Sequence, residues 1–137
     1  MDESALELVR DWLARAGRDL RSARLLAAAD DPPLDIAIYH CQQAAEKSIK
    51  AWLQGQDVPF PKTHDLLALV KRASESHPDF TRLDHAAAML TPYATAFRYP
   101  GGSYEPMPTR EEFDDALQHA DAIHDFVVTA LPADAQP

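Results

Sequence analysis

The sequence predicts an all-α protein, an antiparallel up-and-down bundle of four long helices plus one short helix. Apolar residues recur at spacings of three and four along most of the chain, which is typical of amphipathic helices. Prolines and glycines gather between these segments, where they end helices. No segment alternates apolar and polar residues as a half-buried strand would. We expect one domain over residues 1–137, with its core over residues 4–130 and a frayed C-terminal tail.

The composition limits the class of protein. Its 137 residues are enough to bury a core, and 46% hydrophobic with 26% charged residues is typical of a globular domain. The formal net charge of −9 opposes non-specific attraction to nucleic acid or to an anionic membrane. The single cysteine, Cys41, allows no internal disulfide, and no stretch is apolar enough to span a bilayer. We therefore expect a soluble cytoplasmic protein without membrane contact.

The segment from about Leu34 to Gln54 is predicted to be the central helix. One apolar stripe at helical spacing contains Ile38, Cys41, Ala45, Ile49, Trp52 and Leu53. Glu46 and Lys50 are four residues apart, in the order that favours an ion pair on a helix. Gly55 suits a C-terminal cap. Because Cys41 lies in the stripe, it is interpreted as a packed, inert thiol.

The first helix is predicted to run from about Ser4 to Ala29. Ser4 and Glu7 have the spacing of a capping box at its start. Gly17 lies inside this helix, where glycine is unfavourable, and a close contact with another helix would explain it. Two consecutive prolines, at positions 32 and 33, then end the helix.

Two further helical segments follow the central helix. Thr63 is predicted to be the N-cap of a helix that ends near Ser76. Residues 80–97 show another helical pattern, which Pro92 should kink or break near Leu90.

A long loop precedes the last helix. Residues 98–108 contain three prolines and two glycines, and loops of this length in small domains are often functional. Thr109 and Glu112 form a second capping-box pattern and open the last helix.

No metal site or cofactor is expected. The six histidines are scattered, without the paired spacing of metal ligands. No glycine-rich phosphate-binding loop follows a predicted strand, which excludes the ordinary nucleotide-binding folds.

Four residues are candidates for binding a nucleotide or RNA, namely Lys47, Lys50, His64 and Arg98. His64 is expected in the first turn of a helix, where backbone amides favour an anion. The alternative for His64 is an ordinary cap with a histidine that is either solvated or bonded to the core. Lys47 and Lys50 flank the apolar stripe of the central helix with groups that can hydrogen-bond or pair.

Arg98 and Tyr104 are the candidate catalytic residues. A guanidinium that binds phosphate with two hydrogen bonds, next to a phenol, would form a phosphodiester or nucleotide site. Simpler interpretations remain open for both residues. A cation stabilises a helix C-terminus, which Arg98 follows, and Tyr104 would anchor the long loop against the bundle.

Several segments of the chain resemble HEPN domains (higher eukaryote and prokaryote nucleotide-binding domains). They are Trp12-Leu13, Arg18-Asp19-Leu20, the run from Tyr39 to Leu53 with its Gln-Gln-Ala-Ala-Glu-Lys core, Thr63-His-Asp-Leu66 and Phe97-Arg-Tyr-Pro100. The resemblance covers roughly residues 8–130 and implies a helical bundle that is usually a homodimer. It also implies a minimal nucleotidyltransferase as partner, in a toxin–antitoxin module.

The resemblance further implies a ribonuclease site. Many HEPN proteins are metal-independent ribonucleases with an arginine and a following histidine that are separated by four to six residues. Arg98 matches the arginine, but Ser103, Tyr104 and Glu105 occupy the positions of the histidine. The resemblance therefore implies a weak or regulated ribonuclease that acts through Arg98 and Tyr104. A variant of the motif places a tyrosine where Tyr104 stands, and the partner enzyme would adenylylate it.

Two other functions fit the sequence. One is a non-catalytic module that binds a nucleotide or a protein partner, and the other is a dimeric scaffold without a small-molecule ligand. An adjacent nucleotidyltransferase gene would favour the two-protein module over both.

Overall fold

The computed structural model describes residues 1–101 and 106–137, and it confirms the predicted all-α fold. Within these residues there are five α-helices and no strand. The α-helices are α1 (Glu3–Ala27), α2 (Leu34–Gly55), α3 (Leu66–Ser74), α4 (Asp84–Leu90) and α5 (Arg110–Ala130). The described residues also form three short 3₁₀ helices, η1 (Pro78–Leu83) between α3 and α4, η2 (Thr91–Ala94) after α4 and η3 (Ala133–Ala135) after α5.

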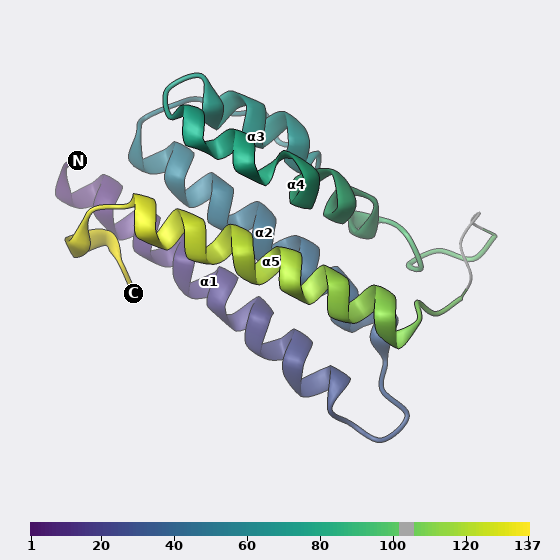
Figure 1. Ribbon diagram of the computed structural model, residues 1–137. Helices are drawn as coiled ribbons and strands as arrows, with labels where there is room; N and C mark the ends of the chain where they lie inside the picture. Colours follow the sequence, from purple (N-terminus) through teal and green to yellow (C-terminus); the bar gives the residue numbers. More distant parts are fainter. Residues whose placement is uncertain (102–105) are drawn as a thin grey trace.

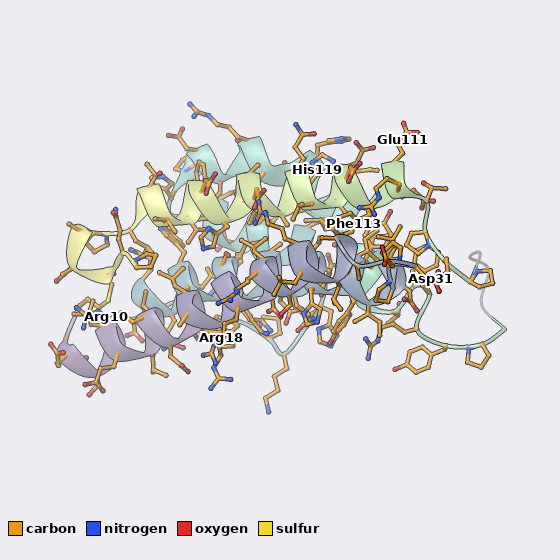
Figure 2. All side chains as sticks on the ribbon, turned by 90° about the horizontal axis from the view of Figure 1, so that it is seen from below. Arg10, Arg18, Asp31, Glu111, Phe113 and His119 are labelled. Carbon is orange, nitrogen blue, oxygen red and sulfur yellow. The ribbon has the colours of Figure 1, made fainter. Side chains whose placement is uncertain are left out.

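Helix α2 is the centre of the bundle. It contacts α1, α3, α4 and α5, with the most extensive contacts to α1 and α5. The ribbon shows α1, α2 and α5 running along the length of the molecule, with α3 and α4 together on one side (Figure 1). The turn after α1 and the beginning of α5 lie at the end of the bundle away from both termini (Figure 1). Asp31, Glu111 and Phe113 lie toward this end, and Arg10 lies toward the other (Figure 2).

The stripe predicted on the central helix forms the core. Every residue of that stripe is buried, including the thiol of Cys41. Trp52 packs against Phe80 with their ring centroids 4.7 Å apart, and Phe80 in turn packs against Phe126 at 4.9 Å. These aromatic contacts attach η1 and α5 to α2, because aromatic side chains bury large apolar areas.

Two of the predicted helix caps were wrong, each by two residues. Asp2, not Ser4, caps α1, and its side chain accepts a hydrogen bond of 2.8 Å from the backbone amide of Ala5. Asp65, not Thr63, caps α3. In both cases two good capping residues lie within two positions, and the aspartate also places a negative charge at the positive end of the helix dipole. The capping box predicted at the start of α5 is confirmed.

Both glycine predictions in the helices were wrong. Gly55 is the last residue of α2, and Asp57 adopts the left-handed conformation after it, with φ of 55°. Gly55 instead makes room for neighbours, since a Cβ there would lie 3.0 Å from Met1 Cε and 3.3 Å from Val9 Cγ2. Gly17 has no close helix contact, because a Cβ there would meet nothing within 4 Å.

The fourth helical segment is interrupted as the proline pattern predicts. Helix α4 ends at Leu90, and the 3₁₀ helix η2 continues the segment with Pro92 in its first turn. Proline fits there because it needs no amide donor at the start of a helix. Helix α3 ends at Ser74, two residues before the predicted end.

The C-terminal tail is not frayed, contrary to the expectation from the sequence. Leu131 and Ala135 are buried in the core, and η3 packs near the beginning of α1. Arg10 donates two hydrogen bonds to the carbonyl oxygen of Asp134, at 3.0 and 2.7 Å. The burial of Leu131 and Ala135 and the hydrogen bonds from Arg10 therefore hold the C-terminal tail on the bundle, although its composition alone suggests a disordered end.

Candidate functional site

Arg98 follows a strained turn at the end of the fourth helical segment. Phe97 has a φ of 67°, a left-handed conformation that is uncommon for a bulky residue. Backbone strain of this kind is concentrated at functional sites, where the surrounding structure maintains it. A pocket of about 220 Å³ lies here, lined by Asp35, Ile36, Phe97 and Arg98. The turn therefore brings Arg98 to the first turn of α2.

The guanidinium of Arg98 lies on an aromatic ring. Its central carbon is 3.9 Å from the ring centroid of Tyr39, which is within the range of a cation–π contact. Stacking uses the face of the guanidinium and leaves the N–H groups at its edge available. Arg98 is exposed, and no described residue pairs with its N–H groups. The arrangement suits binding of an anion with two parallel oxygens, such as a phosphate.

The second candidate catalytic residue lies outside the described residues. Tyr104 falls between residues 101 and 106, as do Ser103 and Glu105. The predicted pairing of Arg98 with Tyr104 therefore stays a prediction.

A charged cluster joins α1 to α2 beside Tyr39. Asp19 accepts a hydrogen bond from Lys47 Nζ at 2.6 Å and lies 2.8 Å from His40 Nδ1 through its other oxygen. The side chain of Asp19 is only 10% exposed, so both contacts act with little screening by water. His40 in turn contacts the edge of the Tyr39 ring, with centroids 5.9 Å apart.

A second cluster of the same kind joins α2 to the segment before α3. Glu46 is buried, and its two oxygens contact His64 Nδ1 at 2.8 Å and Lys50 Nζ at 3.0 Å. Gln42 also donates to Glu46, at 3.1 Å. Burial alone would raise the pKa of the Glu46 carboxyl, but hydrogen bonds from His64, Gln42 and Lys50 outweigh it and hold the pKa below its usual value.

Three of the four residues predicted to bind a nucleotide or RNA, namely Lys47, Lys50 and His64, belong to these two clusters. The ammonium groups of Lys47 and Lys50 each lie within 3.0 Å of a carboxylate, so their charges are already balanced. His64 precedes the cap of α3 and is not in its first turn, where the sequence had predicted it. Its imidazole contacts Glu46 through one nitrogen, while the side chain remains 66% exposed. Arg98 is thus not brought into contact with the other three candidates.

Among the described residues, the buried cysteine and the groups that could bind a metal give no alternative site. Burial raises the pKa of the Cys41 thiol to about 12, so the nucleophilic thiolate is scarce near neutral pH. Across the described part of the chain, no group of three or more His, Cys, Asp or Glu side chains is arranged to hold a metal ion. None of the described helices combines the length and apolar character that crossing a bilayer requires.

The sequence did not single out Asp19 or His40 as part of a cluster. Asp19 lies among apolar residues on the inner face of α1, between Ala16 and Leu20, and is buried with them. A buried charged residue needs a partner, so the position of Asp19 within the apolar face could have indicated an ion pair from the sequence alone. The partner itself is 21 residues away in the chain and is fixed only by the packing of α1 on α2.

A family model of the HEPN domain matches residues 9–131, which is most of the chain. The chain belongs to the HEPN family. Three of the segments that carried the resemblance meet in the structure, since Asp19 bonds to Lys47 and Glu46 contacts His64. The segments that resemble HEPN domains therefore include residues that hold the helices together, namely Asp19, Glu46, Lys47 and His64. Arg98 is exposed and is not one of them.

Two solved structures resemble this HEPN domain closely. One is TT1696 from Thermus thermophilus, with 28% sequence identity and a TM-score of 0.77 over 90% of this chain and 98% of that chain. The other is ST0689, an archaeal HEPN homologue, with 25% identity and a TM-score of 0.70 over 89% of this chain and 96% of that one. No functionally curated protein matches the sequence.

Proposed function

We propose that this HEPN domain is the toxin-like component of a two-protein module with a minimal nucleotidyltransferase, and that it is a weak or regulated ribonuclease. The observation that carries the proposal is the exposed guanidinium of Arg98 on the ring of Tyr39, beside a strained turn. Its free edge suits the two non-bridging oxygens of a phosphodiester. A fixed cation there stabilises the negative charge that develops on phosphorus during cleavage.

The reaction needs no metal ion. The 2′-hydroxyl of the ribose attacks the adjacent phosphate, and Arg98 balances the charge of the pentacoordinate intermediate. His64 is a second candidate contact for the RNA backbone, because its exposed imidazole is held by Glu46 at 2.8 Å. Lys47 and Lys50, whose charges pair with carboxylates, support the site through the framework and not through direct contact with RNA.

The test of this function is RNA cleavage by the purified chain in the presence of a metal chelator. We expect products that end in a 2′,3′-cyclic phosphate and a loss of cleavage in Arg98→Ala. Arg82→Ala is the matched control, because Arg82 is an exposed arginine on η1, outside the Arg98 pocket. Equal cleavage by wild type and Arg98→Ala, or no cleavage by wild type, would contradict the proposal.

We also propose that two copies of the chain share the cleft at Arg98. Ile36 lines the Arg98 pocket and is exposed, and Tyr99, the next residue after Arg98, is 69% exposed. Large apolar side chains grouped at one place on a surface are typical of interfaces. A two-fold dimer would cover them and bring two arginines to one cleft. Light scattering that gives the mass of a monomer at micromolar concentration would rule out a composite site.

Tyr104 is proposed as a regulatory acceptor. A free phenol has a pKa near 10, so at neutral pH it is a poor general base compared with histidine. We expect co-expression with a cognate nucleotidyltransferase to add adenylyl groups to the chain and Tyr104→Phe to remove them. Tyr99→Phe is the control, because it changes a tyrosine five residues earlier in the same loop. Modification that persists in Tyr104→Phe would show that another residue is the acceptor.

The alternative is a non-catalytic module that binds a nucleotide or a protein partner. It is favoured by the sequence after Arg98, where Ser103, Tyr104 and Glu105 occupy the positions of the family's histidine. A nucleotide that binds to wild type but not to Arg98→Ala, without RNA cleavage by either, would support this alternative.

A further inference from the structure

A histidine lies beside the aromatic platform on which Arg98 rests. Tyr39 contacts the Arg98 guanidinium with its face, at 3.9 Å, and the His40 imidazole at 5.9 Å between ring centroids. The guanidinium and the imidazole are therefore no farther apart than these two distances combined. His40 is far from residues 103–105 in the chain, where the family motif predicts a histidine, but the ring of Tyr39 contacts both His40 and the motif arginine.

The imidazole of His40 is held in a defined orientation. Its Nδ1 lies 2.8 Å from one oxygen of Asp19, and Lys47 donates to the other oxygen at 2.6 Å. A carboxylate on Nδ1 fixes the tautomer that carries its proton there and leaves Nε2 as a proton acceptor. Among the described contacts of His40, none involves Nε2. This is the geometry of a general base with an orienting carboxylate.

Only one of the two histidine–carboxylate–lysine clusters has a contact with the arginine platform. His64 is held by Glu46 and Lys50 in the same way, but its ring has no aromatic contact with Tyr39 among the described residues. His40 also has the more enclosed side chain of the two.

We propose that His40 is the proton-transfer group of the Arg98 site, a catalytic residue that takes the place of the motif histidine. The inference rests on the proposed ribonuclease function. The O–H bond of the ribose 2′-hydroxyl breaks, its proton passes to Nε2 of His40, and the freed oxygen forms a bond to phosphorus. The bond from phosphorus to the 5′-oxygen then breaks, that oxygen takes up a proton from water, and the His40 imidazolium releases its proton to water. The products are a 2′,3′-cyclic phosphate and a 5′-hydroxyl, so no further reactant is required.

The charged and titratable groups that contact His40 or its platform come from three elements. Asp19 approaches from α1, Tyr39 and Lys47 lie on α2, and Arg98 approaches from the turn after η2. Asp19 holds His40 and Lys47 through its two oxygens, and Arg98 lies on the face of the Tyr39 ring.

The experiment compares His40→Ala, His40→Gln and His85→Ala for RNA cleavage in a metal chelator, with and without added imidazole. We expect kcat/KM to fall at least about 100-fold in both His40 variants, the usual contribution of a general base. Free imidazole should partly restore cleavage by His40→Ala, with a dependence on pH that follows the titration of imidazole. Imidazole should not restore cleavage by Arg98→Ala. His85→Ala removes an exposed histidine of α4 and should cleave like wild type.

Each other outcome overturns the inference. If either His40 variant cleaves RNA at the wild-type rate, His40 is not the base. If folded His40→Ala is inactive and imidazole restores nothing, His40 is a structural residue. The side chain of Gln in His40→Gln can still donate a hydrogen bond to Asp19, so this variant should keep the fold. If His40→Ala does not fold, cleavage by His40→Gln decides whether His40 is the base. If wild type cleaves no RNA, the proposed function fails and this inference fails with it; if wild type cleaves, only the role of His40 is in question.

Discussion

Replacement of Glu46 by Gln should destabilise the protein far more than replacement of a surface carboxylate would. Glu46 is buried and contacts His64 at 2.8 Å and Lys50 at 3.0 Å. The amide of Gln has nearly the same shape but no charge, which leaves the Lys50 ammonium, 10% exposed, without its partner. Removal of one member of a buried ion pair costs about 3–5 kcal/mol. The exposed His64 can turn toward water, which reduces the cost. We therefore expect Glu46→Gln to lower the free energy of unfolding by about 2–4 kcal/mol at pH 7.

The loss should depend on pH in a defined direction. The pKa of Glu46 in the folded state lies below its usual value of 4.5, so folding favours the ionised carboxyl. The stability that this gives is fully present above the unfolded pKa and is lost as the pH falls through the folded pKa. The difference between wild type and Glu46→Gln should therefore shrink as the pH is lowered from 7 to below about 4.

Urea denaturation followed by circular dichroism measures both effects, provided that the slope with urea is unchanged. Glu75→Gln is the control, since Glu75 pairs with Arg72 at 2.7 Å but both side chains are largely exposed. An exposed pair contributes about 0–1 kcal/mol. Equal losses in the two variants, or a loss in Glu46→Gln that stays constant down to low pH, would refute the reasoning.

Three further predictions concern the framework of the bundle. Trp52→Ala should lower the free energy of unfolding by about 3–5 kcal/mol, because Trp52 is 3% exposed and packs on Phe80; a loss below about 1 kcal/mol in urea denaturation would contradict this burial. Asp2→Ala should cost about 1 kcal/mol and Ser4→Ala almost nothing, since only Asp2 caps α1; thermal denaturation that ranks them the other way would restore Ser4 as the cap. Because burial raises the pKa of Cys41 to about 12, an aromatic disulfide reagent at pH 8 should label the thiol only as fast as the protein unfolds; rapid labelling of the native protein would show an accessible thiolate.

The sequence was a good guide to the helices because their apolar faces repeat locally. The stripe through Ile38 and Trp52 predicted which face of α2 is buried, and Pro92 predicted the break after Leu90. The choice of cap was harder, since Asp2 and Ser4 both suit the position and only the path of the chain decides between them.

The site was harder to predict because its contacts join residues that are distant in the chain. Asp19 meets Lys47 across 28 positions, and Glu46 meets His64 across 18. Helical periodicity says that a residue faces inward but not which residue of another helix it will meet. The left-handed turn at Phe97 was also invisible, because an aromatic residue gives no local signal for a positive φ. Arg98 was found by its motif, whereas its stacking on Tyr39 and the presence of His40 needed the fold.

The central claim is that the motif arginine belongs to a site and not to the framework of the bundle. The most direct measurement is the free energy of unfolding of Arg98→Ala by urea denaturation. The guanidinium is exposed and contacts one ring, at 3.9 Å from the Tyr39 centroid. An exposed cation–π contact contributes about 0.5–1 kcal/mol, so we predict a loss of no more than about 1 kcal/mol. A loss of about 3 kcal/mol or more, as for a buried ion pair, would show that Arg98 is a structural strut and would contradict the account.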